Sequence, residues 1–115
     1  MFNWSIMKLA IIGSRDLTIT NISDYINSEV TEIVSGGAKG VDSAVAEYAK
    51  IKNIPLTEFL PDYSRYKRAA PLKRNEQIAE YADEALAFWN GISKGTLYTI
   101  ELFKKLDKKV TVIKM

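Results

Sequence analysis

The chain contains neither cysteine nor histidine. Without cysteine it cannot form disulfides, thiolate zinc sites or a cysteine nucleophile. Without histidine it lacks the commonest general base, the central member of a Ser-His-Asp triad and the commonest transition-metal ligand. Any catalysis would therefore depend on carboxylates, lysine, arginine, tyrosine, hydroxyl or backbone groups, and we expect no metal and no cofactor.

Long apolar runs and a strong net charge are also missing. No stretch approaches the roughly 18 apolar residues that span a membrane. The opening residues MFNWSIM lack the basic start and the long apolar stretch of a signal peptide. We therefore expect a cytoplasmic protein without membrane contact. A net charge of +2 over the chain is too small to indicate nucleic acid by itself.

What the chain does have is enough apolar residues for one core. It is 115 residues long and 47% hydrophobic, which fits one domain over residues 1–115. Met7 could be an internal start, because MKLAIIG already has the pattern of an opening strand. Residues 1–6 are then expected to be an extension.

Short apolar runs alternate with helical patterns along the chain. KLAII and VTVI are apolar on both alternations, as is typical of strands covered on both faces. Strands that alternate with helices predict an α/β fold with a parallel sheet, helices on both faces and right-handed crossovers. We expect strands at 8–12, 32–35, 56–60, 84–89 and 109–114, helices at 22–28, 41–50, 71–82 and 94–106, and an irregular stretch at 61–70.

Each of the last two predicted helices carries an apolar stripe. The helix at 71–82 has the polar Asn75 on that stripe, which indicates either a local backbone bond or a ligand contact. Glu101 lies opposite the stripe of 94–106, with Lys105 at the i+4 spacing of an exposed ion pair. The stripes contain Leu72, Ile78, Ala79 and Ala82 in the first helix, and Leu97, Ile100, Phe103 and Leu106 in the second.

Three predicted strands end in small or polar motifs: GSRD after the first, SGGAKG after the second and NGISKGT after the fourth. Ligands of open α/β sheets bind at the carboxyl ends of the strands, and helix N-termini there suit phosphate. One such loop could equally be a tight turn. Three at one edge favour a ligand, although neither a Walker loop nor G-x-G-x-x-G is present.

Residues 63–75 hold five Lys or Arg and no acid, with Tyr63 and Tyr66 among them. Such a run is either a solvated face or a surface for phosphate or single-stranded nucleic acid. Arg74 is the best candidate to reach a ligand. Asp42 lies in the first turn of the helix after SGGAKG. Its carboxylate either interacts favourably with the helix dipole or contacts a ribose hydroxyl.

The motifs GSR, SGGAKGVD, KRN and GISKGT, in this order, resemble the SLOG superfamily. It groups the Rossmann domain of the DNA-processing protein A, the Lonely Guy proteins and the small YspA-like proteins, to which this chain is most similar over residues 7–114. The resemblance implies a modified Rossmann fold with strand order 3-2-1-4-5, a nucleotide or nucleotide-derived ligand, and a homodimer. The motifs and the resemblance together predict as ligand-binding residues Gly13, Ser14, Arg15, Ser35, Gly36, Gly37, Ala38, Gly40, Asp42, Arg74, Asn75, Asn90, Gly91, Lys94, Gly95 and Thr96.

The Lonely Guy proteins hydrolyse the bond between a base and ribose 5′-phosphate, and their loop P-G-G-x-G-T-x-x-E ends in a catalytic Glu. Here Thr99 stands at the position of that Glu, and Glu101 lies elsewhere on the helix. Whether the chain is an enzyme is left open. A nucleotide-binding or sensor domain is the favoured function, with a nucleotide N-glycosidic hydrolase and a single-stranded nucleic-acid-binding module as alternatives.

Overall fold

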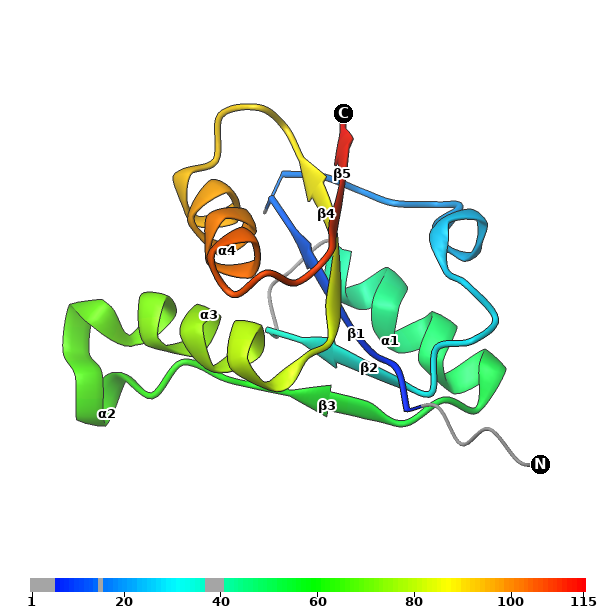
Figure 1. The fold of residues 1–115 in the computed structure, drawn as a ribbon, viewed down its shortest axis with the longest axis horizontal. Coiled ribbons are helices and arrows are strands. Elements are labelled where there is room, and N and C mark those ends of the chain that lie inside the picture. Colours follow the sequence, from blue (N-terminus) through cyan, green and yellow to red (C-terminus); the bar gives the residue numbers. More distant parts are fainter. Residues whose placement is uncertain (1–5, 15, 37–40) are drawn as a thin grey trace.

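The protein is an α/β fold built on a five-stranded parallel sheet (Figure 1). A computed structural model describes residues 6–14, 16–36 and 41–115, without the side chain of Asp42. The strand order is β3-β2-β1-β4-β5, so the predicted fold class and strand order are confirmed. In chain order the elements are β1 (Lys8–Gly13), the 3-10 helix η1 (Ile22–Tyr25), β2 (Glu32–Ser35), α1 (Val41–Lys52), β3 (Leu56–Glu58), α2 (Tyr63–Tyr66), the 3-10 helix η2 (Lys67–Ala69), α3 (Ala70–Tyr81), β4 (Glu84–Trp89), α4 (Lys94–Lys105) and β5 (Val110–Lys114).

Strand β1 lies at the centre, and the chain builds the sheet outward from it in two directions. It first adds β2 and β3 on one side, then crosses over to add β4 and β5 on the other. The loops after β1 and β4 therefore lead away from each other, and this divergence is where open α/β sheets form ligand clefts.

The sheet separates two apolar layers. Alternate residues of each strand point to opposite faces, so Leu9 and Ile11 face α1 and η1, whereas Ala10 faces α3 and α4. The layer on the α1 side contains Leu9, Ile11, Ile33, Val41, Val45, Leu86 and Phe88; the layer on the α3 and α4 side contains Ala10, Val34, Ile78, Ala79, Ala85 and Phe103. Within the described ranges, no helix is long and apolar enough to cross a membrane.

Two predicted segments differ in the structure. The helix expected at 22–28 is only the four-residue 3-10 helix η1, because Ile22 is its one buried residue and anchors a single turn. The stretch expected to be irregular at 61–70 contains α2 and η2. Asp62 caps α2 by accepting hydrogen bonds from the Ser64 hydroxyl (2.7 Å) and the Arg65 N–H (3.2 Å), and these donors lower the pKa of its carboxyl.

The buried face of α4 contains only two members of the predicted stripe, Ile100 and Phe103. Leu97 and Leu106 are exposed, while Thr96 and Thr99 are buried beside Ile100 and Phe103. The threonines can be buried because their hydroxyls find local partners, such as the Gly95 carbonyl for Thr99 (2.9 Å).

Two further expectations for these helices are wrong. Leu72 of α3 is 44% exposed, because it lies at the rim of a cavity and not over the core. Glu101 and Lys105 are exposed and form no ion pair among the described residues, as expected of long side chains whose charges water solvates well.

Lys108 joins the end of α3 to the chain that follows α4. Its ammonium donates hydrogen bonds to the carbonyls of Ala79 (2.7 Å), Glu80 (3.0 Å) and Ala82 (2.8 Å). A helix leaves its last carbonyls without intrahelical donors, and the three N–H groups of the ammonium supply three donors for this end. These three hydrogen bonds cap the C-terminal end of α3 just before β4 starts.

We predict that Lys108→Met lowers the free energy of unfolding by about 2 kcal/mol, because three carbonyls lose a charged donor. Urea unfolding followed by circular dichroism measures the change. The matched control is Lys105→Met, which removes an exposed lysine and should change stability by less than about 0.5 kcal/mol. Equal effects of the two substitutions would mean that the capping bonds contribute nothing.

A polar cluster joins the end of α3 to β2 and β3, on the side of the sheet away from β5. The Tyr81 hydroxyl donates to Glu32 Oε2 at 2.6 Å, and the Thr57 hydroxyl donates to the same oxygen at 2.7 Å. The ammonium of Lys8 lies 4.2 Å from the centre of the Tyr81 ring. The bond to Glu32, with burial as a second cause, raises the pKa of Tyr81 above its usual 10.0.

The pKa of Tyr81 is higher in the folded protein than in the unfolded chain, where it is about 10. The hydrogen bond to Glu32 therefore stabilises the folded state fully below pH 10, and this stabilisation is lost as the pH rises through the pKa of the folded protein. Tyr81→Phe should therefore lower the urea midpoint at pH 7, with a difference from the parent that shrinks above pH 10. Tyr63→Phe, at an exposed tyrosine, is the control and should show no such trend. A difference for Tyr81→Phe that is constant with pH would contradict the role of its proton.

Candidate functional site

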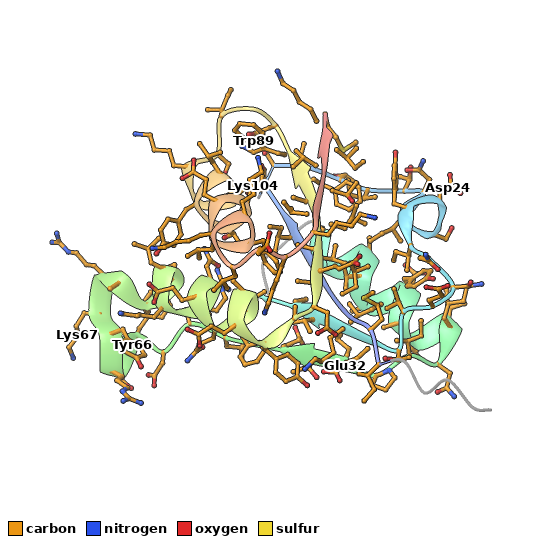
Figure 2. The ribbon with its side chains drawn as sticks, viewed as in Figure 1. Asp24, Glu32, Tyr66, Lys67, Trp89 and Lys104 are labelled. Atoms are coloured by element: carbon orange, nitrogen blue, oxygen red, sulfur yellow. The ribbon has the colours of Figure 1, made fainter. Side chains whose placement is uncertain are left out.

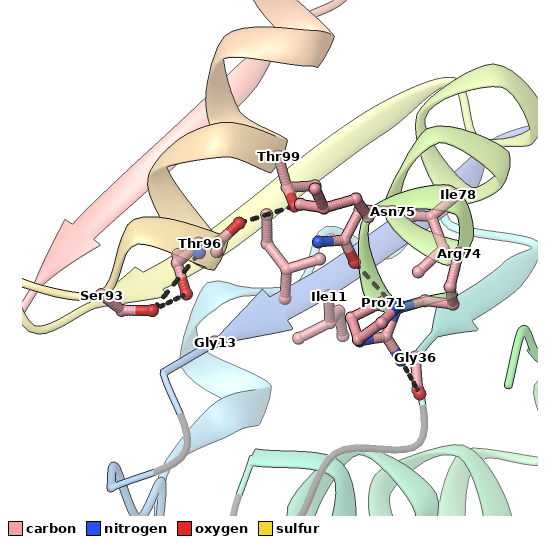
Figure 3. A pocket seen from close by; sticks show the side chains of 13 residues that line it. Ile11, Gly13, Gly36, Pro71, Arg74, Asn75, Ile78, Ser93, Thr96 and Thr99 are labelled. Carbon is pink, nitrogen blue, oxygen red and sulfur yellow. Dashed lines mark hydrogen bonds between the residues drawn. The ribbon is translucent and has the colours of Figure 1, made fainter. Parts of the chain in front are cut away.

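A cavity of about 160 Å³ opens at the carboxyl ends of the strands, between α3 and α4 (Figure 3). Its floor comes from the end of β1, and its walls come from the first turns of the two helices. The lining residues are Ile11, Ile12, Gly13, Gly36, Pro71, Leu72, Arg74, Asn75, Ile78, Ser93, Gly95, Thr96 and Thr99. Four segments that are separated in the sequence, the end of β1, Gly36 after β2, α3 and the start of α4, thus meet at the edge where the sequence predicts a ligand.

Arg74 is the one cation among these lining residues. Its Nη1 donates to the Gly36 carbonyl, and its Nε donates to Asn75 Oδ1 at 2.8 Å. A Cβ at Gly36 would lie 2.8 Å from Nη1, so the guanidinium lies directly against the glycine backbone. Gly36 therefore serves close packing by Arg74, which is half-buried and held in one orientation.

Asn75 presents a donor to the cavity. Its Oδ1 is taken by Arg74, and its Nδ2 has no acceptor among the described residues. Figure 3 shows the amide directed into the space between α3 and the end of β1. The local backbone bond considered from the sequence is not formed in the described part of the chain, and the amide remains available to an acceptor on a ligand.

The N-terminus of α4 forms the opposite wall. Ser93 caps the helix by accepting a hydrogen bond from the Thr96 N–H (3.3 Å). The N–H groups of Lys94 and Gly95, in the same first turn, have no acceptor among the described residues. A Cβ at Gly95 would meet no atom within 4 Å. The first turn therefore offers free donors and open space, together with the partial positive charge of a helix start.

Ser14, Asn90 and Gly91 have structural roles next to the cavity and do not line it. The Ser14 hydroxyl, 2% exposed, accepts from the Asn90 N–H (3.3 Å) and lies 3.5 Å from the Thr96 hydroxyl. Asn90 Oδ1 accepts from the N–H groups of Ile92 and Ser93, both at 2.8 Å. Gly91 adopts φ +83, which a residue with a side chain rarely adopts. These bonds shape the turn that presents the start of α4.

The predicted site residues thus fall into three groups. Gly13, Gly36, Arg74, Asn75, Gly95 and Thr96 line the cavity. Ser14, Ser35, Asn90, Gly91 and Lys94 lie in the same loops or at the adjoining helix start but do not line it. Arg15, Gly37, Ala38 and Gly40, and the side chain of Asp42, lie outside the described residues.

No carboxylate faces this cavity from the described residues. Asp16 accepts a hydrogen bond from Asn90 Nδ2 at 3.0 Å, and Glu76 is engaged by Tyr98 and Lys73. Glu101 is exposed on α4, whereas Thr99 lines the cavity. Nor do the described residues contain a cluster of three or more His, Cys, Asp or Glu that could hold a metal. The lining suits binding of an anion better than acid–base chemistry.

Seven lining residues escaped prediction from the sequence: Ile11, Ile12, Pro71, Leu72, Ile78, Ser93 and Thr99. Ser93 had a detectable signal, since Ser before a helical pattern favours an N-cap. The apolar residues had none, because strand ends and helix faces look the same whether they line a cavity or a core.

Scans of the chain against protein-family models, curated proteins and solved structures each found no match. The resemblance to the SLOG superfamily therefore remains a prediction.

Gly13, at the end of β1, separates the floor of the cavity from α1. A Cβ there would lie 2.5 Å from Cγ2 of Val41, a buried and β-branched side chain with little freedom to move. Gly13→Ala should lower the free energy of unfolding by about 2 kcal/mol through overpacking. Gly95→Ala is the control, expected to leave stability within about 1 kcal/mol of the parent or slightly above it. Chemical denaturation measures both, and a harmless Gly13→Ala would contradict the tight packing.

Proposed function

We propose that the chain is a nucleotide-binding domain that holds its ligand, without cleaving it, in the cavity between α3 and α4. One observation carries the proposal: Arg74 and Gly95, whose N–H at the start of α4 has no acceptor among the described residues, both line a cavity whose described lining has no acid. Backbone donors at a helix N-terminus and a guanidinium are the groups that proteins use for phosphate.

The electrostatics favour an anion. Arg74 stays charged at all ordinary pH values, and the helix start adds about half a positive charge. Because the cavity is partly enclosed, these charges are less screened than they would be on an open surface. A phosphate between Arg74 and the first turn of α4 would neutralise both.

The remaining lining favours a nucleotide over inorganic phosphate. Asn75 Nδ2 is placed to donate to a ribose or base oxygen, and Leu72, 44% exposed at the rim, offers an apolar surface to a base. At about 160 Å³ the cavity is smaller than the roughly 300 Å³ at the low end of ligand pockets. The cavity would therefore hold only the phosphate and the ribose, and the base would lie outside it against Leu72. The ordered motifs that resemble the SLOG superfamily support the same ligand class.

Hydrolysis of an N-glycosidic bond is the alternative, and the cavity favours binding alone. Such hydrolysis needs a carboxylate or another base near the bond. The described lining offers Ser93, Thr96 and Thr99, and the Thr99 hydroxyl already donates to the Gly95 carbonyl. Neutral hydroxyl groups of this kind position a ligand without activating water.

The direct test is isothermal titration calorimetry with nucleoside mono-, di- and triphosphates, ADP-ribose and inorganic phosphate. We expect at least one nucleotide to bind more tightly than phosphate. Arg74→Gln should weaken that binding at least tenfold, because it removes the only cation of the described lining. Arg68→Gln, at an exposed arginine outside the cavity, is the matched control and should bind as the parent does.

Gly95→Ala provides a second variant, because its methyl group would occupy the open space at the start of α4 with little effect on folding. It should weaken the nucleotide while the melting temperature without ligand stays unchanged. Binding of no nucleotide, or equal affinity for the parent and Arg74→Gln, would refute the proposal. Release of free base from a bound nucleotide, detected by chromatography, would establish the hydrolase instead.

A further inference from the structure

The segment between β3 and α3 forms an arm at one end of the molecule. We define the arm as residues 60–69, which include α2 and η2. The molecule is 47 Å long, and the arm lies at one end of this axis, to the left in Figure 1. Neither α2 nor η2 contains a buried residue. The arm therefore contributes little to the core, and its side chains are available to a partner.

Positive charge is concentrated on the arm and the first turns of α3. Residues 63–75 hold five of the 16 Lys and Arg of the chain and no acid, which leaves 11 Lys and Arg against 14 Asp and Glu elsewhere. Outside this segment the chain is thus net acidic. Lys73 is paired with Glu76 (3.5 Å). The positive charge of the arm itself therefore comes from Arg65, Lys67 and Arg68, set against one acid, Asp62, which caps α2.

The arm also exposes an aromatic ring. Tyr63 is 56% exposed, and its side chain, like that of Arg68, makes no hydrogen bond or ring contact within the described ranges. The guanidinium of Arg65 lies 5.1 Å from the centre of the Tyr66 ring, which covers one face of that ring with a cation. Figure 2 shows Lys67 and Tyr66 at this outer end, far from Asp24. The exposed ring of Tyr63, in the same segment as these cations, suits stacking by unpaired bases.

The arm leads directly into the cavity wall. Helix α3 starts at Ala70, immediately after η2, and Pro71, Leu72 and Arg74 of its first turns line the cavity. A nucleotide in the cavity that continued as a chain past Leu72 would bring its next phosphates over the cations of the arm. A free nucleotide would not need these cations.

We propose that the arm binds single-stranded nucleic acid, so that the ligand of the cavity is one nucleotide of a longer strand. This inference rests on the proposed nucleotide site for the placement of one end of the strand. Stacking on Tyr63 favours a single strand over a duplex, whose bases are not free to stack on a side chain. The combination of an open tyrosine, three cations and continuity with the cavity favours nucleic acid over an acidic protein.

Fluorescence anisotropy with a labelled 20-nucleotide oligo(dT) tests the inference. Three phosphate contacts predict that affinity falls about 20-fold between 50 and 200 mM salt, by the slope of about −0.7 per contact for single strands. The triple variant Arg65→Gln, Lys67→Gln, Arg68→Gln should lose at least tenfold in affinity and most of this salt dependence. Tyr63→Ala should lose about tenfold by removing one stacking contact.

The matched control is the triple variant Lys50→Gln, Lys52→Gln, Lys105→Gln, which removes the same charge at exposed positions on α1 and α4. It should change affinity less than threefold. An equal loss in this control, binding of a 20-residue polyglutamate as tight as that of the oligonucleotide, or equal affinity for the dT·dA duplex would each overturn the inference. So would the absence of oligonucleotide binding.

The two proposals can fail separately. The arm variants should keep the parent's affinity for the mononucleotide found by calorimetry, since none of the changed residues lines the cavity. Oligonucleotide binding that depends on the arm, without any mononucleotide binding, would uphold the arm and refute the cavity proposal. Mononucleotide binding without oligonucleotide binding would uphold the cavity proposal and refute the proposal for the arm.

Discussion

The pairing of β1 with both β2 and β4 is the constraint on which the rest of the structure depends. Because all neighbouring strands are parallel, these pairings bring the carboxyl ends of three strands to one edge. Gly36 after β2 and the start of α4 after β4 thereby come to flank the end of β1 at one cavity. A different strand order would separate these loops by the width of a strand or more, and Arg74 could not reach the Gly36 carbonyl.

The second determinant is that no acid among the described residues lines the cavity. Asp16 is bonded by Asn90, Glu76 is bonded by Tyr98 and Lys73, and Glu101 is exposed on α4. Burial, and then the bond to Glu76, raise the pKa of Tyr98, so this link between α3 and α4 stays protonated at neutral pH. The described lining keeps only Arg74 as a charged group. No described lining residue would therefore repel an anion, which agrees with the proposed function.

Polar residues on the inner face of α4 show how packing and function share one element. Thr96 and Thr99 are buried beside Ile100 and Phe103, in place of the predicted Leu97 and Leu106. Local hydrogen bonds satisfy the two threonine hydroxyls. This arrangement keeps the wall of the cavity polar and narrow in place of a fully apolar contact with α3. It also places Leu97 and Leu106 on the exposed side of the helix. A simple apolar periodicity misjudges such a helix, because it assumes that the buried face is the apolar one.

The sequence by itself determined the fold class, the extents of the long elements to within a few residues, and the loops that carry the site. Alternating strand and helix patterns and glycine-rich strand ends are local signals. The motifs, together with the SLOG resemblance, predicted six residues that line the cavity: Gly13, Gly36, Arg74, Asn75, Gly95 and Thr96. Only the tertiary structure decided which of the predicted residues face the cavity and which shape the turns, since that depends on the rotation of α3 and α4 against the sheet. It also decided that residues 60–69 form an arm, because one turn of helix capped by Asp62 has too weak a periodicity to be detected. The lack of a carboxylate at the described lining is tertiary too: the chain has 14 acidic residues, and the fold places none of those that the structure describes on the cavity lining.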